Sequence, residues 1–302
     1  MAQIILDDLP YEKRIAYLQE QANKRAFIEE LKTFAKEGET YLYKLTVEGT
    51  ARVQTLKSDF GITSMHELTF VGLDAETGRF RFILKELSYN LDKYEDPVVV
   101  QIIEMSNMIS EIYQELDFYT DRYGNLKAIN NREEIRKRWD KVKEYLTYKH
   151  PLSSYEIILT KEKEMAKPEL EMNNIRFIHF IHMFFMQFGR YEEIGEFEVN
   201  DQDRFGSGVP FRVRMKYKTR KEDDNKIHRH MEGYLLHDPE VIKALSRAVK
   251  DPHADVVYKT RADYHGIGNR IEEANFSFEE RIGESHHMYS HLNLKLVTED
   301  GK

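Results

Sequence analysis

Three closely spaced residues, His228, His230 and Glu232, form the sharpest candidate metal site in the sequence. Alternate side chains of a β-strand share a face, so the two histidines would lie about 6.6 Å apart along a strand. Two ligands of one zinc ion can bridge that separation. The same spacing also occurs on the solvated face of ordinary strands, so the pattern is compatible with a histidine-dependent metal enzyme and with a polar strand that binds no metal.

Two further histidine groups could take part in binding. His179 and His182 have the i, i+3 spacing that brings two side chains together on one helix face, inside an apolar stretch. Apolar surroundings favour neutral imidazoles, which suits either a weak ligand site or core histidines that bond to the backbone. His287 and His291 would stand about 13 Å apart along a strand, too far for one ion.

A glycine-containing loop places His265, Asn269 and Arg270 close together in the chain. These side chains could crowd one loop tip and bind an anion, although a hairpin connection explains the glycines equally well. The sequence contains no Walker A loop, no spaced dinucleotide fingerprint and no nucleophile elbow. We therefore predict no cofactor and no catalytic residues, and favour a noncatalytic protein.

The segment 211–219 alternates between apolar and basic residues. Its face with Arg212, Arg214, Lys216 and Lys218 could bind an acidic partner or a nucleic-acid backbone. Pairing with glutamates on neighbouring strands is the competing interpretation, because opposite charges across strands stabilise sheets.

The overall composition limits the function classes. The 302 residues include 53 acidic and 45 basic side chains, for a formal charge of −8, which disfavours nonspecific binding to nucleic acid. Cysteine is absent, so disulfides and thiolate chemistry are excluded. The 17 Phe and 18 Tyr are typical of a protein that folds around an apolar core.

Targeting signals give a cytoplasmic prediction. The first residues lack a basic region followed by a long apolar region, the pattern of a secretory signal. The most apolar stretch, 175–188, is too short for a membrane span and contains Arg176, His179 and His182. We predict no transmembrane span.

The elements that must position these residues follow from periodicity. Residues 10–36 have the spacing of a helix whose apolar face, including Ile15 and Leu18, should pack on a sheet. Strands are predicted at 41–47, 66–73 and 80–87, with a hairpin at 74–78, and Asp96-Pro97 should open a helix to Leu116.

The run from Leu116 to His150 carries the clearest local signals. A strand, a turn at 121–125 and a second strand at 126–129 precede a helix. Asn131 and Glu134 have the spacing of a capping box at the start of that helix. Trp139, the only tryptophan, should anchor the core.

The remaining chain should form helices and then more strands. Helices are predicted on both sides of Pro168, the second one continuing to Gly189. Its end, 177–188, is apolar almost all round and should be buried or lie under an oligomer interface. Asp238-Pro239 should open another helix. Strands are predicted before it, at 211–219 and 227–236, and after it, at 255–264, 271–280 and 286–297.

We therefore predict an α+β fold of mainly antiparallel, curved sheets in two joined halves, with packing helices that include a buried apolar helix near 175–188. The expected units are 1–150, a helical connector at 151–188, and 189–302, with a single continuous domain as the alternative. The favoured function is a noncatalytic binding or structural protein in a complex, with a protein partner or self-association. The alternative is a module for an apolar small molecule or lipid, in a layout that loosely resembles, at fold level, the half-barrel lipoprotein carriers of bacterial envelopes.

Overall fold

The polypeptide forms a single eleven-stranded sheet with helices around it. The computed structural model describes residues 10–32, 36–92, 108–151, 154–190, 192–203, 205, 209–221, 226–251, 253–268 and 270–298. The strands are β1 (Thr40–Val53), β2 (Leu56–Asp74), β3 (Arg79–Asp92), β4 (Glu115–Thr120), β5 (Leu126–Ile129), β6 (Ile194–Gln202), β7 (Pro210–Lys221), β8 (Lys226–Leu235), β9 (Val256–Ile267), β10 (Arg270–Ile282) and β11 (His286–Leu296). The helices are α1 (Tyr11–Lys32), the short 3-10 helix η2 (Glu111–Tyr113), α3 (Arg132–Lys149), α4 (Tyr155–Met165), α5 (Pro168–Ile175), α6 (His179–Met186) and α7 (Pro239–Ala248).

The sheet is antiparallel throughout, in the order β5-β4-β3-β2-β1-β11-β10-β9-β8-β7-β6. The predicted α+β class with antiparallel pairing is confirmed. The two halves of the chain do not build separate sheets, because β1 pairs with β11 from Tyr43–Leu296 to Val53–His286. Among the described strands, β5 and β6 are the two edges, each with a strand on one side only.

Strand alternation explains which face of the sheet is buried. In β7, every second residue from Phe211 to Thr219 is buried and the basic residues between them are exposed, as predicted. β1 and β2 extend well beyond the predicted 41–47 and 66–73, and they meet in a tight turn where Gln54 has a φ of 56°. β6 was not predicted, because an edge strand with only partly buried positions has a weak apolar pattern.

The predicted short turns form with the expected chemistry. Asp74 accepts hydrogen bonds from the backbone N–H of Glu76 and the hydroxyl of Thr77, and Gly78 has a positive φ of 67°. Asp121 Oδ1 likewise accepts from the N–H groups of Tyr123 and Asn125. These two turns set the registers of β2 with β3 and of β4 with β5.

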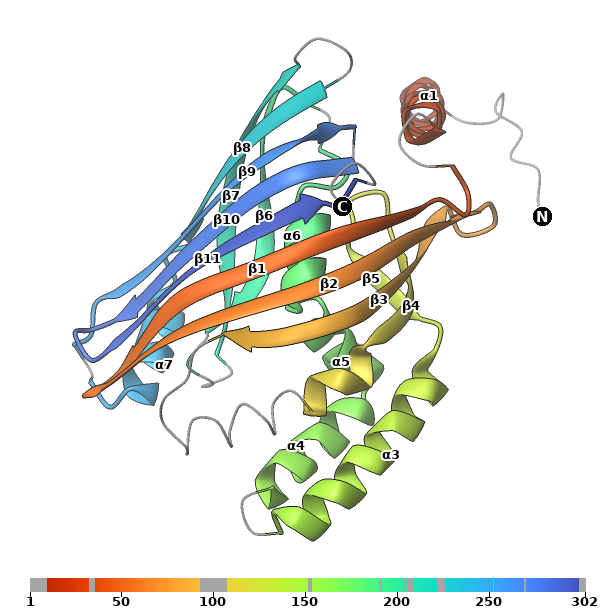
Figure 1. Ribbon diagram of the computed structural model, residues 1–302. Coiled ribbons are helices and arrows are strands. Elements are labelled where there is room, and N and C mark those ends of the chain that lie inside the picture. Colours follow the sequence, from red (N-terminus) through yellow and green to blue (C-terminus); the bar gives the residue numbers. More distant parts are fainter. Residues whose placement is uncertain are drawn as a thin grey trace.

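The helices α3, α4 and α5 form a unit beside the sheet (Figure 1). Trp139 is fully buried, as predicted, and its Nε1 donates to Glu162 at 2.8 Å. The predicted capping box at Asn131 is wrong: this side chain makes no cap bond and instead accepts from Asp117 N and donates to Glu115 O. The Asn131 side-chain amide therefore binds the backbone of β4 and does not cap α3.

Helix α6 lies between the β1–β2–β3 part of the sheet and the β6–β7 part (Figure 1). Tyr43 of β1 packs its ring on Phe180 and Phe184, while Phe82 and Phe118 of β3 and β4 pack on Phe185. From the other half of the sheet, the ring of Phe276 on β10 packs on His182. The Tyr264 hydroxyl on β9 and the Arg229 guanidinium on β8 donate to backbone oxygens at the C-terminal end of α6. Contacts from so many strands require the sheet to curve around the helix.

The expected single helix from Pro168 to Gly189 is wrong in one respect. Pro168 does open a helix, but α5 ends at Ile175 and α6 begins at His179, after Ile178 takes an extended ψ of 124°. The break changes the direction of the chain, so α5 packs on α4 while α6 enters the sheet. Burial of six residues of α6, which no straight extension of α5 would reach, outweighs local helix propensity.

The helix predicted at 10–36 differs from expectation in its packing, and most of the helix predicted from Asp96 to Leu116 lies outside the described residues. Ile15 and Leu18 of α1 are 44% and 46% exposed, so the predicted packing of this face on the sheet is not formed. Residues 93–107 are not among those described, and Leu116, the expected last residue of that helix, belongs to β4.

We expect Phe184→Ala to lower the free energy of unfolding by about 3–5 kcal/mol, because its ring is 1% exposed and leaves a cavity among aromatic neighbours. Urea denaturation followed by circular dichroism measures this change. Leu56→Ala, at a position 75% exposed, is the control and should change stability by less than about 0.5 kcal/mol. Equal effects of the two substitutions would contradict the central role of α6.

His66 links stability to pH. Its Nε2 lies 2.8 Å from Ser64 Oγ, and its ring lies against Phe180. Burial, reinforced by the nearby His179, lowers the pKa of His66 from 6.5 to about 4. The unfolded chain therefore takes up this proton first as the pH falls, so the contribution is complete above pH 6.5 and is lost as the pH falls through about 4.

We expect His66→Gln to flatten the dependence of stability on pH between 6.5 and 4. A displacement of the pKa from 6.5 to about 4 corresponds to a loss of up to about 3 kcal/mol in the wild-type protein across that interval. Denaturation curves at half-unit pH steps, compared between the two proteins, give the difference directly. If the free energy of unfolding depends on pH in the same way in both proteins, His66 is not the source of this pH dependence.

Candidate functional site

A cavity lies where the two edges of the sheet approach each other beside α5 and α6. We call it the seam cavity; its volume is about 320 Å³. Its walls come from the β4–β5 turn and β5, from α5 and α6, and from β6, and include Leu126, Met172, Ile181, Met186 and Val199. Since Leu126 and Val199 belong to opposite edge strands, the curved sheet brings its own two edges to one site.

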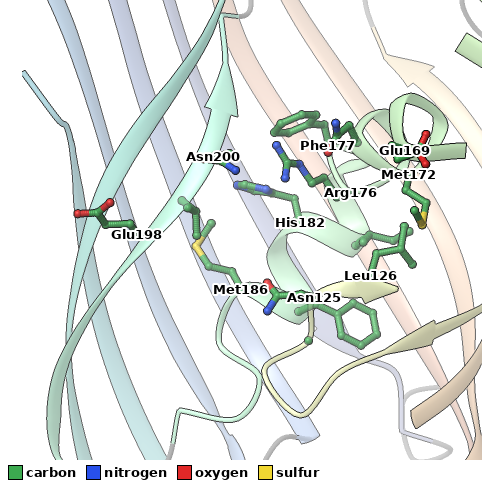
Figure 2. Close-up of a pocket in the computed structure, with 15 residues that line it drawn as sticks. Asn125, Leu126, Glu169, Met172, Arg176, Phe177, His182, Met186, Glu198 and Asn200 are labelled. Atoms are coloured by element: carbon green, nitrogen blue, oxygen red, sulfur yellow. The ribbon is translucent and has the colours of Figure 1, made fainter. Parts of the chain in front are cut away.

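The seam cavity has apolar walls and a polar end. Leu126 and Met172 lie on one side in Figure 2, whereas Arg176 and His182 lie near Asn200 of β6. The carboxylate of Glu198 points away from the cavity and pairs with Arg212 and Arg214 of β7. The site therefore combines an apolar surface with one cation at its end.

Arg176 occupies the break between α5 and α6, which directs its side chain into the seam cavity. Its guanidinium lies 4.7 Å from the centre of the Phe177 ring. The Nε atom is buried without a hydrogen-bond partner. Burial lowers the pKa of Arg176, and the field of Asp201 opposes that shift. In the sequence, Arg176 is notable only as a charged residue that argues against a membrane span at 175–188.

The predicted pair His179 and His182 lies on α6, but the two side chains differ in exposure. His182 is half-buried, lines the seam cavity and contacts the rings of Phe177 and Phe276. His179 is exposed at the first residue of α6, so the interpretation of both as core histidines holds for neither fully. The break before His179 is the reason, because it turns the first residue of α6 toward solvent.

Two glycines hold the β4–β5 turn tightly against the end of α6. A Cβ at Gly124 would lie 2.6 Å from Phe185 O, and one at Gly189 would lie 2.1 Å from Arg122 O. Both glycines also have positive φ values, of 77° and 70°. Backbone packs on backbone here, which fixes the edge strand β5 beside the cavity.

Arg190 spans the seam itself. Its guanidinium lies 5.4 Å from the ring centre of Tyr123 in the β4–β5 turn and 3.8 Å from that of Phe197 in β6. Burial lowers the pKa of Arg190, and the nearby oxygens of Tyr217, Tyr123, Asp121 and Glu192 oppose the shift. Cation–π contacts to both sides let one side chain join two edges that share no ladder hydrogen bonds.

Arg229 of β8 satisfies the buried end of α6. It is 1% exposed and donates to the backbone oxygens of Gln187 and Arg190, and also to Thr219 Oγ1. Tyr264 donates to Met183 O at 2.9 Å. The last carbonyls of a helix have no partners within the helix, and a cation is also favoured at this end. No sequence pattern indicates this role, because Arg229 lies between two histidines in a polar run.

The predicted metal ligands lie on the outer face of the sheet, away from the seam cavity. His228 and His230 do share a face of β8, but His230 bonds to Asp263 at 2.7 Å and to Glu232 at 3.2 Å. His228 stacks on His265 with ring centres 4.4 Å apart. In the part of the chain that the structure describes, no group of three or more His, Asp or Glu side chains could hold a metal ion.

The predicted anion-binding loop is not assembled as expected. His265 stacks on His228, and Arg270 lies near Glu272, with 3.6 Å between their charged atoms. Asn269 is not among the described residues. The expected loop is largely part of β9 and β10, since pairing resumes at Ile267 and Arg270 and aligns the residues along the strands.

The basic face of β7 is paired across strands, which was the competing interpretation. Arg212 and Arg214 both contact Glu198 of β6, at 3.2 and 3.4 Å. Lys216 stands opposite Glu196 on one side and Glu232 on the other.

Within the described residues, no helix is long and apolar enough to cross a membrane.

We expect Arg229→Met to lower the free energy of unfolding by about 2–5 kcal/mol, because buried carbonyls at the end of α6 lose their donor. Arg220→Met, on the exposed face of β7, should change it by less than about 0.5 kcal/mol. Hydrogen exchange at residues 183–190 localises the effect, since these amides should exchange faster only in the first variant. Unchanged protection there would contradict the capping role.

Comparison with known proteins identifies no family. No family model matches the sequence, and no curated protein matches it. Among solved structures, a chain described as "Lipid-protein interactions in lipovitellin" aligns with 87% of this chain at 9% identity and a TM-score of 0.49. The alignment spans 25% of that longer chain. A likeness at this level assigns neither a family nor a function.

Proposed function

We propose that the chain is a noncatalytic binding module that holds one apolar small molecule in the seam cavity. The observation that carries this proposal is the cavity itself, which lies between two sheet edges and has Leu126, Ile181 and Val199 in its walls. Its volume, about 320 Å³, lies at the lower end of the usual range for ligand pockets, about 300–1,000 Å³.

The lining suits a ligand of adaptable shape. Met172 and Met186 contribute flexible, polarisable side chains on α5 and α6. An apolar ligand would cover surface that is now open to water, at about 25 cal/mol for each Å² removed. Between the sheet and α6, aromatic rings such as Phe180 and Phe185 pack against Tyr43 and Phe82. The ligand site is therefore the seam beside α6.

The seam also offers a route of entry. The edges β5 and β6 are not neighbours in the sheet, so moving them apart breaks no ladder hydrogen bond between them. The contacts that such movement disturbs include those of Arg190 with Tyr123 and Phe197. Exchange of a cation–π contact costs about 0.5–2 kcal/mol, far less than opening a paired strand along its length.

The function that the sequence favoured, a structural protein in a complex, remains a prediction. The feature that favours it is a group of exposed side chains on α3 and α4: Tyr148 is 80% exposed, Tyr155 62% and Tyr145 45%. Exposed aromatic groups are common at protein interfaces. Native mass spectrometry of the untagged protein separates the two functions, because additional chains favour assembly and a small stoichiometric mass favours ligand binding.

We expect the neutral fluorescent probe N-phenyl-1-naphthylamine to bind the wild-type protein with increased emission. Val199→Trp should weaken this binding at least tenfold, because the indole fills the seam cavity from β6. Val53→Trp, at a valine 39% exposed in the β1–β2 hairpin, is the matched control and should bind the probe normally. Thermal unfolding establishes that both variants are folded. Equal binding by a folded Val199→Trp protein, or no binding by wild type, would refute the proposed site.

A further inference from the structure

Arg176 is the one side chain of the seam cavity whose charge and surroundings call for a specific partner. It is half-buried, and within the described residues its guanidinium makes no hydrogen bond or ion pair; this group lies over the face of the Phe177 ring. A guanidinium carries five N–H donors and no acceptor. Such a group, partly removed from water, is stabilised by an anion that can accept several of these donors.

The carboxylates among the described residues do not supply that anion. Asp201 is close enough for its field to act on Arg176, yet no ion pair joins them, and Asp201 accepts a hydrogen bond from Tyr258. Glu198 pairs with Arg212 and Arg214 on the outer face. Glu169 is exposed in the first turn of α5, seven residues before Arg176, and no ion pair joins these two side chains within the described residues.

The surroundings of Arg176 can complete an anion site. His182 lies beside it and can donate a hydrogen bond, and Asn200 borders the same polar end from β6. The apolar walls begin next to this polar end, with Ile181 and Met186 on α6 and Met172 on α5. A ligand that fits both parts must have an anionic end and an apolar body.

We propose that the seam cavity recognises an apolar molecule with one terminal anion, whose carboxylate or phosphate oxygens bind the Arg176 guanidinium while its chain lies along α6 and β6. This inference rests on the proposed function and specifies its ligand class. The fork of an arginine matches two oxygens of one anion, which a lysine cannot do. Burial of Arg176, which lowers its pKa, is offset when the anion arrives.

Displacement of bound N-phenyl-1-naphthylamine at pH 7.5 tests the inference, with decanoate, decyl phosphate and decanol as competitors below their micelle concentrations. Wild type should bind at least one of the two anions tenfold or more tightly than decanol, and the comparison of the two anions identifies the head group. Arg176→Gln should weaken anion binding at least tenfold and leave decanol unchanged. The affinity of Arg176→Lys for the anions should fall between those of wild type and Arg176→Gln. Arg214→Gln, on the outer face, should behave as wild type.

The possible failures separate the two proposals. If decanol competes as well as both anions in wild type, or if Arg176→Gln weakens all competitors equally, the seam cavity binds apolar molecules and the role of Arg176 is refuted. If the probe and all competitors fail to bind, the proposed function falls, and this inference with it. The thermal midpoint of Arg176→Gln without ligand should equal or exceed that of wild type; a marked decrease would mean that Arg176 serves the fold instead.

Discussion

The burial of α6 is the constraint on which the rest of the structure depends. Six of its eight residues are buried apolar side chains, so the helix is unstable in water and must be enclosed. The sheet supplies that enclosure by curving until residues from β1, β3, β4 and β10 all reach the helix. Curvature in turn brings the edges β5 and β6 toward each other, and the seam cavity is the space that remains between them.

Enclosing a helix end creates a polar problem that the fold solves locally. Carbonyls at the end of α6 would be buried without donors, and Arg229 and Tyr264 provide donors from the sheet. The close approach of the β4–β5 turn is possible because Gly124 and Gly189 carry no side chains. These contacts hold one edge of the seam rigidly, whereas the other edge, β6, is joined to it through Arg190 and the ring of Phe197.

The inner and outer faces of the sheet use charged residues differently. On the outer face, His230 bonds to Asp263 and Glu232, and Glu198 pairs with basic residues of β7, so charges there neutralise one another across strands. In the seam, Arg176 faces apolar side chains and makes no such pair with any residue that the structure describes. A charge that the fold leaves without a counterpart is costly, and its position at the end of an apolar cavity is what suggests a ligand.

Local signals were sufficient for most elements but not for the site. The turns at Asp74 and Asp121, the helix opened by Asp238 and Pro239, and the alternation of β7 follow from short-range chemistry, and each forms as predicted. The break between α5 and α6, the edge strand β6 and the position of Arg176 could not be predicted, because they depend on burial against strands distant in the chain. The histidine spacing at 228–232 was visible in the sequence, but its partner Asp263 was not, since strand pairing brings it there. The sequence by itself thus determined most of the elements and the need to bury 177–188. Only the tertiary structure decided which polar side chains are neutralised by a neighbour and which polar side chain faces a cavity. These two outcomes depend on how one sheet curves around one helix.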